Sequence, residues 1–344
     1  MRKTRLAIVG LGNVGRRLLE LMQLKRDSLR ARFDLELLIV GVCDSTGGAD
    51  NAMGLDIAKI LELKRAKKEV AAYPDHARGE MRPLDLARAV EADILVELTP
   101  TNLKDGEPGL SVMRDALTRK IPVVTANKGP LVLAYPELAA LAQTNGVRML
   151  HSAAVTGGLP TLNIGVRDLG VTVIEKFEGV VNGTTNYILS RMAQGQPYAD
   201  ALKHAQDIGM AEADPSLDVD GWDAANKLVI IANAVLRRPA ALKDVTVEGI
   251  RKITQADVLA AEEHRQTIKL IALAERVGKS YHLSVRPTLL DKSHPLARLG
   301  AGTMGVIYHT DINGTIFASI EEEDPYPTAA AVLRDIVQIA TTSA

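Results

Sequence analysis

The stretch Gly10-Leu11-Gly12-Asn13-Val14-Gly15 follows an apolar run, Arg5–Val9, and precedes an amphipathic helical pattern, Arg16–Leu24. Glycines with this spacing permit a tight turn, a close approach of the backbone to a pyrophosphate and close packing of helix on strand. The N-terminus of the following helix then faces the phosphate charge. A GxGxxG pattern alone is a weak signal, but between a strand and a helix it is a strong one. The stretch therefore predicts a dinucleotide-binding domain.

The first half of the chain alternates short apolar runs with longer helical patterns, as a parallel sheet covered by helices on both faces does. We therefore predict a doubly wound α/β domain of the Rossmann type. Its expected strands are Arg5–Val9, Leu37–Cys43, Ile94–Glu97, Val123–Thr125 and Arg148–His151. Its expected helices are Gly12–Arg32, Asn51–Leu63, Leu84–Val90, Gly109–Arg119 and Tyr135–Thr144.

The sequence changes character after His151, where the small residues of 152–160 form a loop that suits a domain junction. The second region is expected to be α+β. Its expected strands are Ile174–Val181, Ser280–Leu290 and the region Gly305–Ser319, and its expected helices are Thr185–Met192, Tyr198–Asp207, Asp220–Ala234 and Ala256–Ala274. A final helix, Pro327–Ile339, is expected to pack back on the first domain. We therefore place the nucleotide domain at 1–151, completed by 303–344, and the second domain at 152–302.

Composition limits the classes of partner. The 344 residues include 41 Lys and Arg against 42 Asp and Glu, so no charge excess favours nucleic acid or a membrane surface. No apolar stretch approaches the ~20 residues of a membrane span. A single cysteine, Cys43, cannot form an intramolecular disulfide or a multi-cysteine metal site. We expect a cytoplasmic protein that binds a small molecule.

Asp44 follows the second expected strand, where an acidic residue is expected to bind the ribose 2′-hydroxyl of the cofactor. Its carboxylate favours NAD, but the adjacent Ser45 and Thr46 could hydrogen-bond the 2′-phosphate of NADP. Both cofactors therefore stay open. The alternative for Asp44 is a role in capping a turn.

Two lysines stand in contexts that suit oxidation of an alcohol, which needs a base for the hydroxyl proton and a cation near the alkoxide-like oxygen. Lys128 lies in the motif of residues 125–130, at the end of a predicted strand, and Lys227 follows Asp223 at i,i+4 on an expected helix. The apolar run of residues 228–232 indicates that this helix is largely buried, so Lys227 could accept a proton while Asp223 orients it. The alternative is a surface ion pair of little consequence.

Five acidic residues precede or begin this helix: Glu212, Asp214, Asp218, Asp220 and Asp223. Such a cluster repels itself unless it binds a cation, and the ammonium group of a substrate would serve. A calcium loop is the rival, but the spacing lacks the glycine and the terminal glutamate of an EF-hand. Some of these acids are expected to be helix N-caps, Asp218 or Asp220 first among them.

Four motifs in order resemble homoserine dehydrogenase: Gly10–Gly15, Thr125–Pro130, Gly179–Leu189 and the segment Glu212–Lys227. They span nearly the whole chain, which makes the resemblance more specific than any one motif. It implies interconversion of L-homoserine and L-aspartate 4-semialdehyde with NAD or NADP, in threonine and methionine biosynthesis. It also implies a homodimer formed by sheet pairing in the second domain.

The resemblance also assigns roles to single residues. Lys227 matches the proton-transfer lysine, with Asp223 beside it, and Lys128 matches a lysine between nicotinamide and substrate. The residues that match substrate-binding positions are Glu212, Asp218, Asp223, Gly183 and Thr184. Thr99 matches a position that contacts the cofactor, and Gly302 matches a late glycine that closes over it.

The chain departs from its relatives in two places. Where relatives carry a junction glutamate that helps to hold a monovalent cation such as sodium, this chain has Ser152, so only the carbonyls of Val155, Gly157 and Leu159 are expected to offer ligands. The chain also resembles the short form of the family, without a C-terminal ACT domain, so feedback inhibition by threonine through such a domain is not expected.

Three rival functions were weighed. Aspartate-semialdehyde dehydrogenase needs a cysteine thiolate, and Cys43 is expected at the adenosine end of the site, far from the nicotinamide. A non-catalytic redox sensor would have no reason to keep Lys128, Glu212, Asp223 and Lys227 together. A Rossmann oxidoreductase of another small hydroxy or amino acid stays open.

Overall fold

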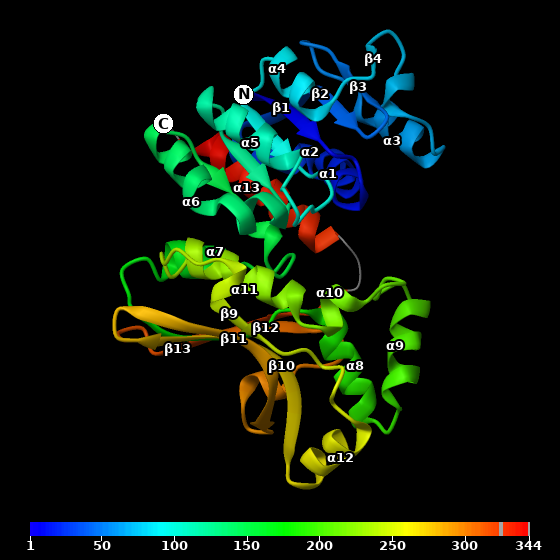
Figure 1. Ribbon diagram of the computed structural model, residues 1–344. Helices are drawn as coiled ribbons and strands as arrows, with labels where there is room; N and C mark the ends of the chain where they lie inside the picture. The colour runs from blue at the N-terminus through cyan, green and yellow to red at the C-terminus, as the bar shows by residue number, and fades with distance from the viewer. Residues whose placement is uncertain (323–325, 343–344) are drawn as a thin grey trace. The chain divides into compact units, whose positions relative to one another are not determined.

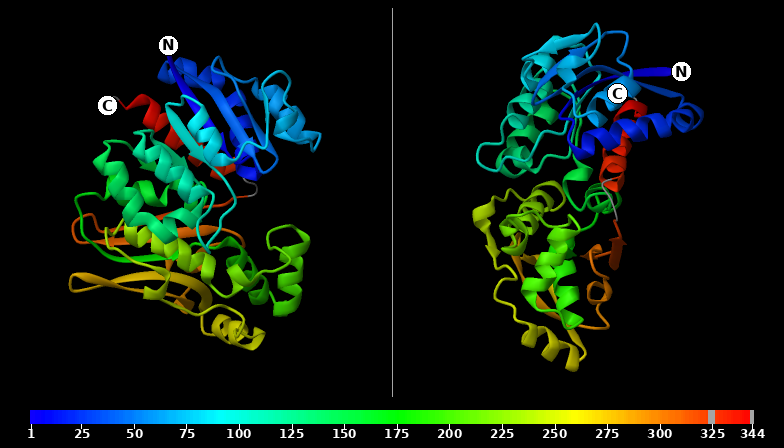
Figure 2. Two further views of the ribbon diagram at one scale, coloured as in Figure 1. Left: turned by 45° about the horizontal axis from the view of Figure 1, so that its top comes forward. Right: turned by 90° about the vertical axis from the view of Figure 1, so that its right-hand side faces the viewer.

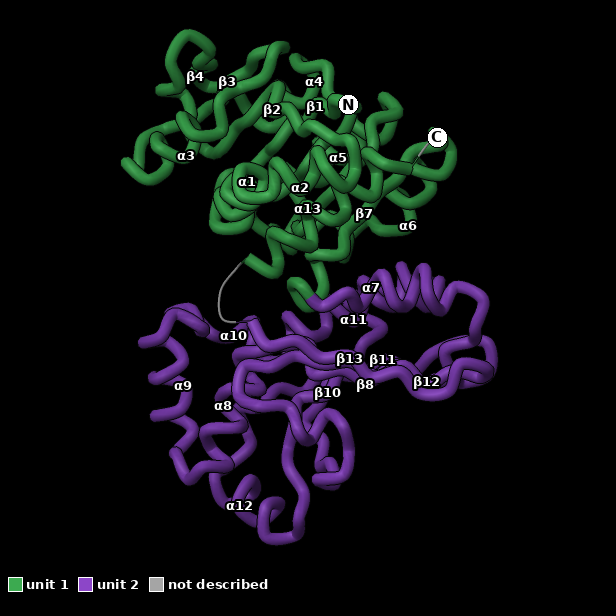
Figure 3. The backbone as a smooth tube through the Cα atoms, turned by 180° about the vertical axis from the view of Figure 1, so that it is seen from behind, with its two compact units in different colours: residues 1–158, 324–344 green, residues 159–323 purple. Residues whose placement is uncertain are grey.

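The computed structural model of the chain describes residues 1–322 and 326–342 and divides into two compact units. The first comprises residues 1–158 and the C-terminal segment 324–344, and the second comprises residues 159–323 (Figures 1 and 3). Each unit is built around one sheet. Among the described residues, no helix has both the length and the apolar character needed to cross a membrane.

The first unit contains a seven-stranded sheet in the order β4-β3-β2-β1-β5-β6-β7. Its strands are β1 (Arg2–Val9), β2 (Leu35–Asp44), β3 (Gly47–Asp50), β4 (Ala77–Gly79), β5 (Ile94–Glu97), β6 (Val123–Thr125) and β7 (Met149–Leu150). The five neighbouring strands β2, β1, β5, β6 and β7 are parallel to one another. Beyond β2, the strands β3 and β4 extend the sheet by antiparallel pairing. The strand order reverses at β1, and in such sheets ligands bind beyond the carboxyl ends of the strands at that point.

Helices cover this sheet as the doubly wound prediction requires. They are α1 (Asn13–Leu24), α2 (Arg26–Phe33), α3 (Ile57–Arg65), α4 (Pro83–Ala89), α5 (Gly109–Thr118), α6 (Lys128–Thr144) and α13 (Tyr326–Thr341). One group packs α1 against α3 and α13, and another packs α5 against α4 and α6. The final helix α13 lies beside α1 (Figures 1 and 2), which confirms that the end of the chain packs back on the first domain. Leu18 of α1 and Ile336 of α13 are both fully buried in this core.

The second unit is α+β, with a six-stranded sheet in the order β13-β12-β8-β10-β11-β9. Its strands are β8 (Ile174–Val180), β9 (Val245–Val247), β10 (Gln266–Val277), β11 (Ser280–Asp291), β12 (Met304–Thr310) and β13 (Thr315–Ile320). All neighbours are antiparallel except β9 and β11. Its α-helices are α7 (Thr161–Asn163), α8 (Gly183–Ala193), α9 (Tyr198–Asp207), α10 (Ser216–Val219), α11 (Trp222–Ala234) and α12 (Gln255–Glu263).

Several predicted elements were wrong. The expected helix Ala256–Ala274 is a helix only as far as Glu263, because Arg265 adopts a positive φ of 59° and the chain then continues as β10. The expected helix Gly12–Arg32 is two helices that meet at Lys25. The expected helix Asn51–Leu63 begins only at Ile57, where Asp56 caps it.

The region Gly305–Ser319 is a hairpin of β12 and β13 rather than one strand, and this corrects the expected domain boundary. Since β12 pairs with β8 and buries Tyr308 and Ile307, residues 304–320 belong to the sheet of the second unit. Of the segment 303–344 that was expected to complete the first domain, only α13 does so. Residues 323–325 and 343–344 of that segment lie outside the described residues.

Candidate active site

A cleft of about 990 Å³ opens in the first unit beyond the carboxyl ends of β1, β2 and β5. Six of the residues predicted to bind a dinucleotide line it: Gly10, Gly12, Asn13, Val14, Asp44 and Thr99. The other three do not line this cleft. Gly15 packs beneath its floor, Lys128 begins α6, and Gly302 belongs to the second unit.

A glycine is needed at each of the three positions of the loop for a different physical reason. Gly10 has a φ of 98°, and a Cβ there would stand 2.3 Å from the carbonyl oxygen of Leu98. A Cβ on Gly15 would stand 2.4 Å from the carbonyl oxygen of Gly10. A Cβ on Gly12, by contrast, meets nothing within 4 Å, so this glycine keeps open space in the cleft just before α1 begins. The cleft thus has a cradle into which a pyrophosphate fits.

Asp44 ends β2 with its carboxylate in the cleft. It accepts hydrogen bonds from Lys64 Nζ at 2.6 Å and from the Thr46 backbone N–H at 2.9 Å. Burial acts to raise the pKa of this carboxyl, but the hydrogen bonds from Lys64 and Thr46 outweigh it and hold the pKa below its usual value. The bond to Thr46 shows that Asp44 also closes a turn, so the two interpretations of this residue are compatible.

Four residues that were not predicted from the sequence line the same end of the cleft from other elements: Lys64 of α3, and Glu80, Met81 and Arg82, which lie between β4 and α4. These residues lie in α3, which connects β3 to β4 along the chain, and in the loop that follows β4. No motif marks these two short strands, which are rich in small residues.

Cys43 lies beside Asp44 on β2 and is fully buried. Burial raises the pKa of its thiol to about 12, with the Asp44 carboxylate adding to the effect. The thiolate that an aspartate-semialdehyde dehydrogenase requires is therefore disfavoured here.

The opposite end of the cleft is lined by Leu98, Thr99 and Ala126, which follow β5 and β6. Lys128 begins α6 just beyond, where the Asn127 side chain caps the helix by accepting from the Gly129 backbone N–H at 2.9 Å. The cap fixes the direction in which the first turn of α6 leaves the sheet.

A second site lies within the second unit, where β8 ends and α8, α10 and α11 approach. Lys227 Nζ lies 2.7 Å from Asp223 Oδ2 and donates to the Val181 carbonyl oxygen at 2.6 Å. Lys227 and Asp223 are 9% and 6% exposed, which contradicts the surface-ion-pair alternative. Asn182 completes the cluster, since its Nδ2 donates to Asp223 at 2.9 Å and to Asp218 at 2.6 Å.

The other acids of this region separate from the cluster. Asp220 pairs with Arg251, and Asp214 accepts from the Ser216 backbone N–H at 3.1 Å. Glu212 is exposed, and its backbone carbonyl accepts a hydrogen bond from the Gln206 side chain at 3.1 Å. The expectation that Asp218 or Asp220 is the N-cap of a helix was wrong, because Pro215 and Gly221 occupy the N-cap positions of α10 and α11, and Asp220 is instead the C-cap residue of α10.

Gly183 and Thr184 form the first turn of α8, which Asn182 caps by accepting from the Thr185 backbone N–H at 2.8 Å. The structure brings Gly302 next to this turn, since a Cβ on Gly183 would stand 3.1 Å from the Gly302 carbonyl oxygen. Asn182 belongs to the motif Gly179–Leu189 but had been assigned no role. Its amide is what joins the start of α8 to the two acids.

The junction loop offers little to a cation. Ser152 donates to the buried Asp335 of α13, through its backbone N–H at 2.8 Å and its hydroxyl at 2.7 Å. The Val155 carbonyl accepts from the Thr156 hydroxyl at 2.7 Å, and Gly157 and Leu159 fall on either side of the boundary between the units. Among the described residues, no group of three or more His, Cys, Asp or Glu side chains is arranged to hold a metal.

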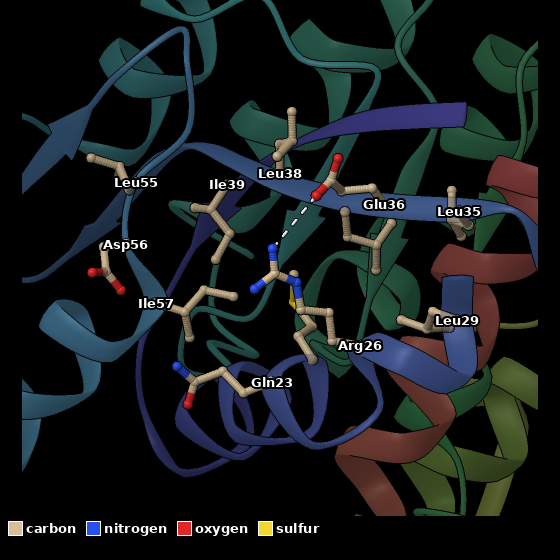
Figure 4. Close-up of a pocket in the computed structure, with 12 residues that line it drawn as sticks. Gln23, Arg26, Leu29, Leu35, Glu36, Leu38, Ile39, Leu55, Asp56 and Ile57 are labelled. Atoms are coloured by element: carbon tan, nitrogen blue, oxygen red, sulfur yellow. Dashed lines mark ion pairs between the residues drawn. The ribbon is translucent and has the colours of Figure 1, made fainter. Parts of the chain in front are cut away.

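Another pocket of about 360 Å³ lies at the other end of β2, between that strand and α1 (Figure 4). Arg26 points toward Glu36 across it, at 3.6 Å. None of the predicted site residues lines this pocket.

Comparison with known proteins agrees with this arrangement. Two sequence models of known families match the chain. The model of the NAD-binding domain of homoserine dehydrogenase matches residues 10–152. The model of homoserine dehydrogenase itself matches residues 160–337. The homoserine dehydrogenase of Methanocaldococcus jannaschii is 37% identical over 334 residues, 96% of this chain and 97% of that protein. The NAD(+)-dependent homoserine dehydrogenase of Pseudomonas canavaninivorans is also 37% identical, over 98% of this chain and 97% of its own.

The fold comparison gives the same answer. The crystal structure of a homoserine dehydrogenase from Thiobacillus denitrificans superposes with a TM-score of 0.86 at 31% identity, over 99% of this chain and 74% of that one. Two models of one family thus match residues 10–152 and 160–337, which together make up most of the chain. The chain belongs to the homoserine dehydrogenase family.

Proposed function

We propose that this enzyme interconverts L-homoserine and L-aspartate 4-semialdehyde, with Lys227 as the proton-transfer residue. The observation that carries the proposal is the buried ion pair of Lys227 and Asp223 at 2.7 Å. An ammonium has three donors, and Asp223 and the Val181 carbonyl take two of them, which leaves the third for the substrate oxygen. In the oxidative direction the Lys227 side chain accepts the hydroxyl proton, and in the reverse direction it returns that proton.

When bound, the nicotinamide supplies the hydride acceptor: the C–H electron pair of the carbinol carbon leaves with its hydrogen, and the C–O bond becomes a carbonyl. Lys227 takes the proton at the same oxygen, so charge does not accumulate there. We assign Lys128, at the start of α6, to orientation of the reacting groups between nicotinamide and substrate.

The substrate amino group is assigned to the acids that Asn182 joins, Asp218 and Asp223, with Glu212 at the exposed margin. The first turn of α8, with Gly183 and Thr184, is assigned to the substrate carboxylate, because a helix N-terminus favours an anion. Gly302 lies against this turn and is assigned to closing the site over the bound cofactor.

We propose NAD as the preferred cofactor over NADP. The charged Asp44 carboxylate suits a ribose 2′-hydroxyl and repels a 2′-phosphate, while Lys64 is already engaged by Asp44 at 2.6 Å. The Pseudomonas canavaninivorans relative is likewise named as NAD(+)-dependent. The proposed proton transfer uses no monovalent cation, because Ser152 offers no carboxylate to hold one.

The setting of the reaction belongs to the proposal too: a cytoplasmic homodimer acting in threonine and methionine biosynthesis. The single, buried Cys43 agrees with a reducing compartment. The exposed apolar side chains of Leu289 on β11 and Phe317 on β13 agree with pairing through the second sheet.

The test is to incubate the purified protein with L-homoserine at alkaline pH, with NAD and NADP separately, and to follow absorbance of the reduced nicotinamide. Reduction that depends on homoserine and is faster with NAD is expected. Absence of reduction in a protein that binds the cofactor would overturn the substrate assignment, and faster reduction of NADP would overturn the cofactor preference.

A further inference from the structure

Glu97, the last residue of β5, is completely buried, and its carboxylate accepts hydrogen bonds from three residues, Thr99, Thr125 and Asn127. The Thr99 backbone N–H donates to Oε1 at 2.8 Å and the Thr125 hydroxyl to Oε2 at 2.8 Å. The Asn127 side-chain amide donates to Oε1 at 3.3 Å, and the Thr99 hydroxyl also donates to Oε1. A carboxylate that accepts several hydrogen bonds retains its charge more readily than an isolated buried one.

No lysine or arginine of the described residues forms an ion pair with Glu97. The positive ends of two helices approach it instead. Gly109, the first residue of α5, lies so close that a Cβ there would stand 3.1 Å from Glu97 Cδ, and α6 begins at Lys128, next to Asn127. Burial raises the pKa of Glu97 above its usual value, and the hydrogen bonds from Thr99, Thr125 and Asn127 oppose this rise without cancelling it.

The residues that Glu97 binds line or adjoin the end of the cleft that lies opposite Asp44. Thr99 lines the cleft itself. Asn127 donates to the Thr99 hydroxyl at 3.2 Å and at the same time caps α6 through the Gly129 N–H, so it sets the first turn, on which Lys128 lies. One carboxylate therefore ties together the loop after β5, the loop after β6 and the start of α6.

This end of the cleft is where the nicotinamide lies in a Rossmann domain, since the adenosine occupies the end with the acid of β2. The oxidised nicotinamide ring carries a positive charge and the reduced ring carries none. A carboxylate without a countercation, held in a dry site near the ring, attracts the oxidised form and leaves the reduced form nearly unaffected.

We propose that Glu97 is a positioning residue that fixes Thr99 and the first turn of α6, and that its charge favours binding of the oxidised cofactor over the reduced one. The proposal rests on the proposed function, because it takes this end of the cleft as the nicotinamide site. No comparison assigns a role to this side chain.

The test is Glu97→Gln in the full chain. The amide keeps the size of the side chain, and the Thr125 hydroxyl can turn to accept from it, so the connections survive while the charge is lost. Isothermal titration calorimetry should show the Kd of NAD⁺ rising about fivefold to tenfold and that of NADH changing less than about twofold. Equal changes in both constants, or no change in either, would overturn the proposal.

Thr125→Val and Glu36→Gln complete the design. Thr125→Val keeps the charge but removes the hydroxyl that donates to Glu97 and accepts from the Asn127 backbone N–H at 2.9 Å, so kcat should fall about tenfold while the ratio of the two Kd values stays as in the wild type. If the ratio of the two Kd values also shifts in Thr125→Val, then loss of the hydrogen bonds around Glu97, rather than loss of its charge, explains the effect. Glu36→Gln, at the other end of β2, should leave both cofactor constants unchanged. Failure of the wild type to oxidise homoserine would reject the proposed function alone, because the binding constants are measured without substrate.

Discussion

Lys227 Nζ lies 2.7 Å from Asp223 Oδ2, one helical turn away on α11, and both side chains are buried. The pair is not isolated, because the Asn182 amide donates to the same Asp223 oxygen at 2.9 Å and links it to Asp218. A buried pair of this kind costs desolvation and gains little stability over apolar residues of the same size. Its presence at the end of β8 is better explained by chemistry than by folding.

Replacement of Lys227 by Met tests that explanation. Met keeps the length of the side chain but cannot exchange a proton, so kcat for homoserine oxidation should fall about 10²–10⁴-fold. The Kd for NAD should stay within about twofold of the wild type, because the cofactor cleft is lined by residues of the first unit. Steady-state kinetics and calorimetry measure the two quantities.

Lys203→Met is the matched control. Lys203 and Asp207 also form an i,i+4 pair at 2.8 Å, on α9, but both side chains are exposed. This variant should keep its kcat, as exposed pairs contribute little. A Lys227→Met enzyme that retains more than about a tenth of wild-type kcat would remove Lys227 from proton transfer.

The substrate amino group gives a second prediction, which separates two acids of one segment. Asp218→Asn should raise the KM for L-homoserine at least about tenfold, because the ammonium loses a charged partner beside Asn182. Asp220→Asn should leave KM nearly unchanged, since Asp220 is engaged by Arg251. Equal effects of the two substitutions would mean that neither acid contacts the ammonium group directly, and that both only add to the negative potential around the site.

The sequence predicted the parts of the site that lie close together along the chain. The glycine loop and the Lys227–Asp223 pair are of this kind, because helix and turn geometry alone determine which of their atoms meet. Asn182, Lys64 and Glu97 were not found, since they bind Asp218, Asp44 and Asn127, which lie 36, 20 and 30 positions away along the chain. Only the completed sheet brings these side chains together.

The error at β10 has a related cause. Residues 256–263 have helical composition, and Lys269 lies in an apolar run that fits either a buried helix or a buried strand. The pairing of β10 with β8 on one side and β11 on the other decides in favour of the strand, and no local pattern encodes that pairing. The short antiparallel β3 and β4 were missed for the same reason.

Cofactor selectivity gives a third prediction, on Asp44. Asp44→Asn removes the charge that repels a 2′-phosphate and releases Lys64 to bind one. The ratio of kcat/KM with NADP to kcat/KM with NAD should rise at least about tenfold. Asp50→Asn, on β3 and paired with Arg78, is a control that should leave the ratio unchanged. An unchanged ratio in Asp44→Asn would place the ribose elsewhere in the cleft.

The glycine loop allows folding and binding to be separated. Gly10→Ala should lower the free energy of unfolding by about 3 kcal/mol, because of its positive φ and its contact with the Leu98 carbonyl. Gly12→Ala should unfold like the wild type, since its Cβ meets no protein atom, yet weaken NAD binding at least about tenfold by occupying the approach to the pyrophosphate. Chemical denaturation and calorimetry check both. Wild-type affinity in Gly12→Ala would reject this loop as the phosphate cradle.

Lys269 of β10 yields a prediction on the pH dependence of stability. Its Nζ donates to Asn186 Oδ1 at 2.6 Å and to the Leu299 carbonyl at 3.0 Å, and Asn186 in turn holds the carbonyls of Gly300 and Thr303 on either side of Gly302. Burial lowers the pKa of Lys269 from 10.5 to about 8, against a weaker opposing effect of Glu262.

Between about pH 8 and 10.5 the unfolded chain therefore binds this proton while the folded chain does not, so the stability contributed at this site rises with pH in that window and is lowest below pH 8. The difference in unfolding free energy between wild type and Lys269→Met should shift in favour of the wild type by about 1–2 kcal/mol from pH 8 to pH 9.5, as measured by urea denaturation at each pH. Other titrating groups are common to both proteins and cancel. A difference that stays flat over this range would mean that the Lys269 ammonium is stabilised in place, and that the loop around Gly302 is held by a charged rather than a neutral amine.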